Sequence, residues 1–297
     1  MTELPPPSAR VYTPSARMKI RAANIPMGLP EPESRGYDDL YREFDSPLMQ
    51  RLRREAYGRD IGQHSWVTAE ELEEDIARLQ LSRASRLADL GCGPCGPLTF
   101  VTRQVRCQST GMDLSANAIA AGQARAAAMG IAELMTLIVT DLNQPIQFDK
   151  GAFDALLSLD VVLHLRDRAE VFREVARVLV PGGRFLFTDA GVVTGSVSDE
   201  EIQRRAIHGH TQFAPLGFNE AMLERAGLRL LDRIDRTASV LKNAMGRRAA
   251  RVAYRGELEP LEGQARFERE QQHLETVIGL SQRGALARMM YLAEARA

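Results

Sequence analysis

Apolar residues recur with helical spacing in the first part of the chain, before a different pattern begins at about residue 83. Steps of three and four between apolar positions over 37–57 predict an amphipathic helix that is interrupted near Pro47. A second helix is predicted to begin after Thr68, because Glu71 three residues later completes a capping-box pattern. Residues 1–36 contain frequent prolines and no apolar periodicity, so we expect a flexible arm there.

Short apolar runs alternate with helical patterns from residue 83 onward. The runs predicted to be strands are Arg86–Leu90, Val105–Met112, Thr136–Thr140, Phe153–Leu159 and Arg184–Thr188. Helices are predicted between them, at Ser115–Met129 and Arg168–Val180. Repeated alternation of strand and helix indicates an α/β fold, in which a parallel sheet has helices on both faces.

In the C-terminal part of the chain, the apolar pattern predicts helices before a closing strand. Residues 198–227 are expected to be partly helical and partly irregular, and Leu228–Ile234 is expected to be a strand. Helices predicted over 240–254 and 261–280 precede a final strand at Ala287–Ala295. The two late strands are therefore separated by a helical insertion.

The composition is that of an ordinary globular protein, since 44% of the 297 residues are hydrophobic and 26% are charged. The 38 Lys and Arg against 39 Asp and Glu leave a net charge of −1, which does not favour nucleic acid as a partner. No apolar run approaches the ~20 residues of a membrane span, and residues 1–10 lack the apolar core of a secretory signal. We therefore expect a cytoplasmic protein that binds neither a membrane nor nucleic acid.

The spacing of cysteine and histidine does not indicate a metal site. Cys92 and Cys95 have the spacing of a zinc pair, but they lie inside a glycine loop and the chain has only one further cysteine. His208 and His210 lack a third ligand at metal-binding spacing. We expect no metal, and we interpret both cysteines as small residues that line a tight turn.

A glycine-rich loop after the first predicted strand carries the strongest chemical signal. It runs from Asp89 to Gly96 with the sequence DLGCGPCG, and its glycines let the backbone approach a ligand closely. Gly91, Gly93 and Gly96 also fit the pattern of a dinucleotide-binding loop. Two cofactor classes therefore compete: a nicotinamide or flavin dinucleotide, and S-adenosylmethionine.

Acidic residues at successive strand ends favour S-adenosylmethionine. Asp89 precedes the first glycine by two residues, where its carboxylate would repel a pyrophosphate and attract an ammonium group. Asp113 and Asp141 end the next two strands, where they would accept hydrogen bonds from the ribose hydroxyls and the adenine amino group. A dinucleotide site is expected to have the acidic residue for the ribose, as Asp113 would be, but not the second one for the adenine. The Pro-Gly-Gly turn within 179–184, from a helix into a strand, completes the pattern.

Together these segments resemble the core of the class I S-adenosylmethionine-dependent methyltransferases. The resemblance rests on the sequences LADLGCG, GMDLS, TDL, FDALLS and LVPGGR, and it covers about a third of the chain. It implies a Rossmann-like, mostly parallel sheet of seven strands whose last strand is antiparallel. It also implies a methyltransferase domain at 83–297 that binds S-adenosyl-L-methionine, with a helical lid at 37–82, a lid or insertion around 195–227 and further helices at 240–283.

The resemblance implies a set of cofactor contacts, mostly from loops that follow the first four strands. They are Asp89, Gly91, Cys92, Gly93, Asp113, Leu114, Asp141, Leu142 and the backbone near Ser158 and Leu159. Gln63, in the segment GQHSW after the predicted lid helix, is expected to join them.

The candidates for the transfer step follow the fourth strand, in the sequence SLDVVLH. If this segment is helical, Asp160 and His164 lie one turn apart on one face. The carboxylate would then hold a cationic amine while the imidazole takes its proton. A histidine that only caps or packs is the plainer interpretation of His164.

This stretch is similar to the phosphoethanolamine N-methyltransferases, in which a tyrosine from an N-terminal helix closes over the cofactor. Tyr41 or Tyr37 would take that part here. The arginine that binds phosphate in that family has no counterpart near 211–213, so a phosphorylated acceptor requires Arg204 or Arg205 in its place.

The predicted function is methyl transfer to a small-molecule acceptor, with an amine nitrogen as the leading choice. An oxygen or carbon acceptor, as in quinone or natural-product pathways, and a dinucleotide-dependent oxidoreductase stay as alternatives. The basic run Arg247, Arg248, Arg251 and Arg255 is expected to coat a solvated helix face. The sequence does not indicate an oligomeric state, and a homodimer is compatible with it.

Overall fold

The computed structural model describes residues 37–207 and 209–296. The predicted arm at 1–36 and His208 lie outside the described residues. Residues 37–41 are helical and are followed by α2 (Pro47–Tyr57), so the interruption predicted near Pro47 is confirmed. Ser46 caps α2 because its side chain accepts a hydrogen bond from the Met49 amide.

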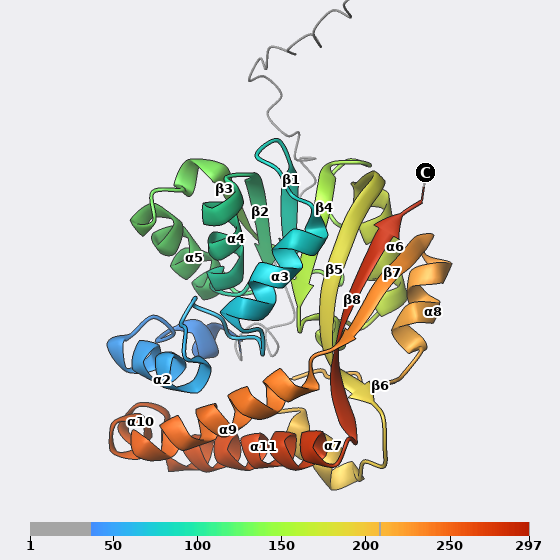
Figure 1. The fold of residues 1–297 in the computed structure, drawn as a ribbon. Coiled ribbons are helices and arrows are strands. Elements are labelled where there is room, and N and C mark those ends of the chain that lie inside the picture. Colours follow the sequence, from blue (N-terminus) through green and yellow to red (C-terminus); the bar gives the residue numbers. More distant parts are fainter. Residues whose placement is uncertain (1–36, 208, 297) are drawn as a thin grey trace, which may run out of the picture.

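A central sheet organises the molecule (Figure 1). Its strands are β1 (Arg86–Leu90), β2 (Gln108–Asp113), β3 (Met135–Val139), β4 (Phe153–Leu159), β5 (Leu179–Val193), β6 (Ala214–Pro215), β7 (Leu228–Asp235) and β8 (Leu286–Ala295). The order is β3-β2-β1-β4-β5-β8-β7, with β6 paired to β5. The first five strands are parallel, and β8 is antiparallel to both of its neighbours. The predicted α/β class is confirmed, and the two-residue β6 brings the seven predicted strands to eight.

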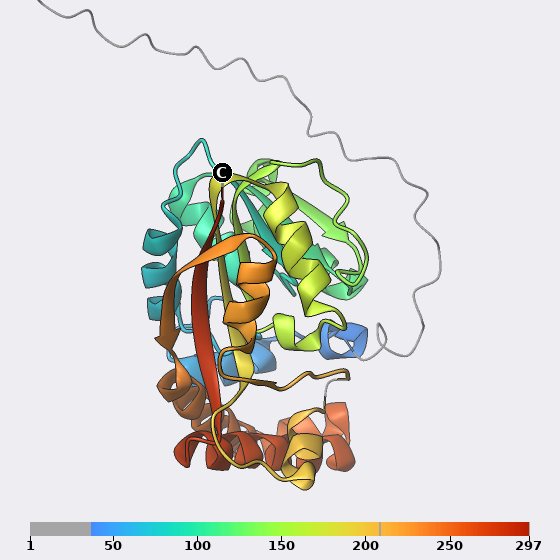
Figure 2. The same cartoon turned by 90° about the vertical axis from the view of Figure 1, so that its right-hand side faces the viewer.

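Helices cover both faces of the sheet, as Figure 2 shows with the sheet seen close to edge-on. On one face, α3 (Ala69–Leu79), α4 (Gly96–Val105) and α5 (Ala116–Ala128) pack on Leu87, Leu157 and Leu186. On the other, α6 (Arg168–Val178) and α8 (Phe218–Arg225) pack on Ala88, Leu156 and Phe185. Consecutive strand residues thus enter opposite cores, which is why these strands read as continuous apolar runs.

A helical layer lies across the carboxyl ends of the parallel strands (Figure 1). It contains α2, α7 (Asp199–Arg205), α9 (Thr237–Ala253), α10 (Arg255–Glu262) and α11 (Gln264–Gln282). The last three form the insertion expected before the final strand. Helix α9 approaches α2 closely at Gly246, where an added Cβ would lie 2.5 Å from the Ala56 carbonyl oxygen. No described helix has both the length and the apolar character needed to cross a membrane.

Two local features differ from the sequence expectations. Thr68 accepts a hydrogen bond from the Glu71 amide at 3.2 Å, but the Glu71 carboxylate binds Arg288 at 2.9 Å, so only half of the capping box forms. Strand β5 is also much longer than predicted, because Leu179 already pairs with Phe153 before the glycine turn. The turn is therefore an irregularity within the strand, with Gly182 at φ +75°.

Candidate active site

One cavity of about 460 Å³ opens at the carboxyl ends of the parallel strands. One wall is formed by the glycine loop and by the segments that follow β2, β3 and β4. The remaining lining comes from residues within 37–41, from Gly62 and 64–66, and from residues of α7, α9 and α11. A parallel sheet binds ligands at this edge, so the cavity is the candidate active site.

Two glycines of the loop need the conformational freedom that only glycine has. Gly91 and Gly93 have φ of +75° and +52°, in the left-handed region. An added Cβ at Gly91 would lie 2.5 Å from a methyl group of Val161, and one at Gly93 would lie 3.3 Å from the Tyr41 hydroxyl. The third glycine, Gly96, serves packing instead, because its Cβ would lie 2.1 Å from the Gly62 carbonyl oxygen.

Two aspartates at adjacent strand ends give the cavity its acidic wall. Asp89 is buried, lines the cavity, and has no hydrogen-bond or ion-pair partner within 37–207 or 209–296. Burial, helped by the charge of Asp113, raises the pKa of Asp89 to about 8. The Asp113 carboxylate accepts hydrogen bonds from the amides of Gly93 at 2.8 Å and Ser115 at 2.9 Å. Burial still leaves the pKa of Asp113 above its ordinary value, because these amides only partly offset the desolvation.

The buried Asp89 predicts a pH-dependent stability for the protein without cofactor. Its carboxyl has a pKa of about 8 in the folded chain and ~3.9 when unfolded. Between these values the folded state binds more protons, so stability falls as pH rises, by on the order of 1.4 kcal/mol per pH unit. The Asp89→Asn variant should lose this dependence and gain melting temperature over the wild type at pH 8 but not at pH 4. Calorimetric scans across that range that show a constant difference would contradict the assignment.

The other predicted cofactor residues divide into those that line the cavity and those that do not. Cys92, Leu114, Asp141 and Leu142 line it. Asp141 also accepts hydrogen bonds from the backbone and side-chain amides of Asn143, both at 2.9 Å. These bonds hold the loop after β3 in position. Among the described residues, no group of three or more His, Cys, Asp or Glu is placed to hold a metal ion.

Gln63 and the backbone near Ser158 and Leu159 were predicted to contact the cofactor, and of these three residues only Leu159 lines the cavity. Gln63 is fully buried outside the cavity, where its side-chain amide accepts from the Ile61 amide at 2.9 Å and donates to the Arg59 carbonyl at 3.3 Å. The Ser158 hydroxyl donates to the Leu90 carbonyl at 2.9 Å inside the sheet, and Leu159 lines the cavity instead. Both polar side chains are thus used to satisfy backbone groups.

His164 faces the cavity from a single 3₁₀ turn (Val162–His164) after β4. Its Nδ1 lies 2.9 Å from the His210 carbonyl oxygen. Because a carbonyl only accepts hydrogen bonds, Nδ1 carries the proton and Nε2 presents a lone pair. Burial, reinforced by Arg205, lowers the pKa of His164, so the ring is neutral at pH 7. Tyr37 packs edge-on against this ring, with centroids 6.2 Å apart.

Both candidate lid tyrosines reach the cavity. Tyr41 is buried over the glycine loop, and its ring lies 5.6 Å from that of His64. Burial raises the pKa of the Tyr41 hydroxyl well above its ordinary value, and Asp113 adds to the effect. This hydroxyl therefore stays a neutral donor at any physiological pH.

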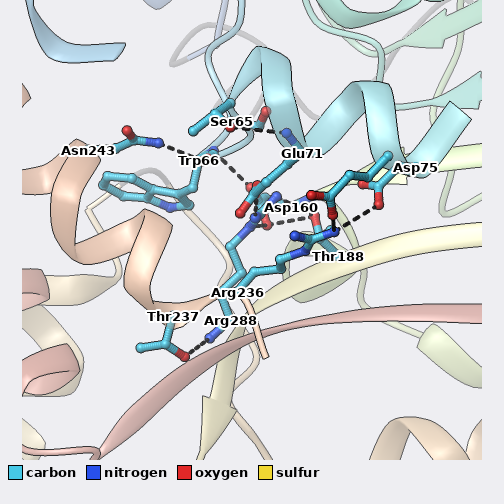
Figure 3. Close-up of polar contacts among 12 residues, drawn as sticks. Ser65, Trp66, Glu71, Asp75, Asp160, Thr188, Arg236, Thr237, Asn243 and Arg288 are labelled. Atoms are coloured by element: carbon cyan, nitrogen blue, oxygen red, sulfur yellow. Dashed lines mark hydrogen bonds and ion pairs between the residues drawn. The ribbon is translucent and has the colours of Figure 1, made fainter. Parts of the chain in front are cut away.

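Asp160 does not occupy the predicted helical position beside His164. Its φ of +60° lies in the left-handed region, so the two side chains are not one helical turn apart. Figure 3 shows that its carboxylate is enclosed by protein groups. One oxygen accepts from Arg288 and from the Thr188 hydroxyl, both at 2.8 Å, and the other accepts from the Trp66 amide at 2.8 Å. Asp160 therefore joins the sheet to the segment 62–66, and its oxygens are already engaged.

Several cavity residues were not anticipated from the sequence. They come from α9 and α11, and they are Arg247, Arg266, Arg269, Glu270 and His273. Arg247 was expected on a solvated face, but its guanidinium lies 4.3 Å from the Trp66 ring centroid and donates to the Ser65 carbonyl at 3.0 Å. Burial lowers its pKa to about 10. Arg247 follows the buried Val240 and Ala244 at helical spacing. This spacing could have placed Arg247 on the inner face of α9 from the sequence.

Comparison with known proteins identifies the central segment. Residues 88–187 match the family model described as a methyltransferase domain. Residues 88–187 are a methyltransferase domain. The predicted resemblance to class I S-adenosylmethionine-dependent methyltransferases is thereby confirmed for this domain, which contains the glycine loop and the strand ends of the acidic wall.

Sequence similarity to known proteins extends beyond the methyltransferase domain into the rest of the chain. The methyltransferase GfsG of Streptomyces halstedii is 28% identical over 55% of this chain and 59% of its own. Phosphoethanolamine N-methyltransferase 1 of Arabidopsis thaliana is 27% identical over 64% of this chain and 39% of its own. The chain thus spans less than two thirds of either relative.

A solved structure confirms the fold over most of the chain. Phosphoethanolamine N-methyltransferase 2 of Haemonchus contortus, in complex with phosphomonomethylethanolamine and S-adenosylhomocysteine, superposes with a TM-score of 0.72 at 19% identity. The match covers 88% of this chain and 60% of the other. The similarity in fold therefore extends well beyond residues 88–187.

Proposed function

We propose that this chain transfers a methyl group from S-adenosylmethionine to the nitrogen of a small-molecule amine. The observation that carries the proposal is the buried, unpaired carboxyl of Asp89 in the cavity wall of the described structure, next to Asp113 on the adjacent strand. A methionyl ammonium group would supply the positively charged partner that the Asp89 carboxyl lacks among the described residues. The ribose hydroxyls would donate hydrogen bonds to the carboxylate oxygens of Asp113. A pyrophosphate fits neither, because it would face two acidic side chains whose ionised forms repel it.

The cofactor, when bound, supplies a methyl carbon that its positively charged sulfur activates. The protein contributes alignment, exclusion of water and removal of a proton. Tyr37 and Tyr41, from the helical residues 37–41, line the cavity, and there they would restrict the entry of water. Nε2 of His164 accepts the proton of the ammonium form of the acceptor, which frees the nitrogen lone pair for in-line attack. Asp160 is a positioning residue, because it holds the Trp66 backbone at the cavity wall.

Calorimetry on the purified chain tests this proposal. We expect saturable binding of S-adenosylhomocysteine and no binding of NADH. Asp113→Ala is expected to weaken the binding of S-adenosylhomocysteine about tenfold or more, because charge-assisted hydrogen bonds to the ribose are lost. Asp232→Ala, which removes a half-exposed carboxylate on β7, is the matched control.

A panel of small amines then tests the transfer step. Production of S-adenosylhomocysteine from S-adenosylmethionine should require both an amine and His164. Saturable binding of NADH without any binding of S-adenosylhomocysteine would overturn the proposal. Turnover with phenols or enols but not with amines would keep the methyl transfer and replace the nitrogen by oxygen or carbon.

A further inference from the structure

A second cavity, of about 510 Å³, lies beside the active-site cavity in the helical layer. It is lined by residues within 39–64 and by residues of α9, α10 and α11. The two cavities share part of their lining, including His64, Arg247 and His273. Well-packed cores leave few voids larger than a water molecule, so a hollow of this size is not a by-product of helix packing. The helical layer therefore offers a ligand further space next to the site of transfer.

Polar and apolar residues divide the second cavity into two ends. At the end shared with the active-site cavity, every lining residue except Leu40 is polar or charged. Beyond it the lining is mainly apolar, with Phe44, Leu52 and Ala250 all buried. The exposed Leu261 continues this apolar lining to the surface. A molecule that fits both cavities therefore has a polar reacting end and an apolar body.

The charged side chains at the apolar end are paired with one another or face solvent. Arg53 binds Asp60 at 2.9 Å, and Arg251 pairs with Glu262. The remaining two charged residues there, at 42 and 43, are exposed. In the part of the chain that the structure describes, this end thus offers a ligand apolar contact and no buried charge in need of a partner.

The active-site cavity by itself leaves little room for a large acceptor. Its volume of about 460 Å³ lies toward the lower end of the ~300–1,000 Å³ of pockets that hold one drug-sized ligand. Under the proposed function it holds the cofactor as well as the reacting nitrogen beside His164. An acceptor with more than a few atoms beyond that nitrogen must therefore extend past the shared residues into the second cavity.

We infer that the acceptor is an amphipathic amine whose nitrogen faces His164 and whose extended apolar portion occupies the second cavity. This inference rests on the proposed function and adds the chemical class of the acceptor. Burial of the apolar portion removes its surface from water, so the affinity depends on its length. Binding of this remote portion also holds the nitrogen in place for in-line attack.

A homologous series of amines tests the inference on the complex with S-adenosylhomocysteine. The series is n-propylamine, n-hexylamine, n-nonylamine and n-dodecylamine, which carry the same amine on apolar chains of increasing length. We expect the affinity measured by calorimetry to rise about two- to fourfold per added methylene group until the cavity is filled. With S-adenosylmethionine as the methyl donor, kcat/KM for methylation of the amine should rise in parallel.

Substitutions on α9 and α2 assign the chain-length dependence to the second cavity. Ala250→Phe is expected to abolish it, because the added ring occupies the apolar end. Ala253→Phe is the matched control, since it adds the same ring at an exposed position of the same helix and should retain the dependence. Met49→Glu introduces a charge at the apolar end from a half-buried position, and it serves if circular dichroism shows that Ala250→Phe is not folded.

The outcomes separate this inference from the proposed function. Equal affinity across the series, or a chain-length dependence that persists in folded Ala250→Phe or Met49→Glu, would overturn the apolar acceptor site. Long amines that bind tightly but are methylated no better than n-propylamine would also overturn it, since the second cavity would then hold a separate ligand. If the wild type does not bind S-adenosylhomocysteine at all, it is the proposed function that fails.

Discussion

His164→Ala is expected to lower kcat by ~10² to 10⁴ while leaving the affinity for S-adenosylhomocysteine unchanged. Nε2 is the only basic atom of this side chain, because the His210 carbonyl fixes the proton on Nδ1. The lowered pKa of the ring keeps that atom available at neutral pH. The wild-type rate should therefore fall only in acid, as the pH drops below the ordinary histidine value of ~6.5.

A second substitution separates base catalysis from packing. In His164→Asn the side-chain amide can still donate to the His210 carbonyl, but it has no basic atom. We expect this variant to melt close to the wild type and to be as inactive as the alanine variant, with partial recovery of His164→Ala by added imidazole. Full activity of the asparagine variant would reduce His164 to the packing histidine that the sequence also allowed.

Arg288→Met is expected to destabilise the protein by about 3–5 kcal/mol, because it leaves Asp160 and Glu71 buried without their shared cation. Figure 3 shows this guanidinium among side chains of α3, β5 and the end of β4. The two carboxylates hold the pKa of Arg288 above its ordinary value, although burial acts in the opposite direction. For a chain of this size the loss corresponds to a fall in melting temperature of roughly 10 °C.

Two further variants give this prediction its controls. Arg229→Met removes a half-exposed arginine that pairs with Glu294 between β7 and β8, and it should cost at most about 1 kcal/mol. Adding Glu71→Gln to Arg288→Met should recover part of the loss, because one uncompensated charge is removed. A melting temperature of Arg288→Met equal to that of Arg229→Met would mean that the buried ion pairs contribute nothing.

The fold was largely predictable because its signals are local. Strands β1 and β4 have the bounds that their apolar runs predicted, and Ser115 caps α5 where the helix was expected to start. The extent of β5 was missed at both ends, because Leu179 pairs with Phe153 of β4 ahead of the glycine turn and pairing with β8 continues to Val193. The short β6 was missed because two residues carry no periodicity.

The site was predictable only on its glycine-loop side. Gly91 and Asp113 could be placed because strand, turn and ligand contact follow one another within a few residues. Asp160 was misjudged because its partner Arg288 is 128 residues away in sequence, and a carboxylate's partners are not visible in its local context. Arg205 was ambiguous for the same reason, since its burial depends on helices that are assembled from distant segments.

The two walls of the cavity are encoded by different stretches of the chain. The glycine loop and the acidic strand ends lie within 88–187, whereas α7, α9 and α11 lie after it. Under the proposed function, mutations in the later helices would change the acceptor side of the cavity and leave the glycine-loop side as it is.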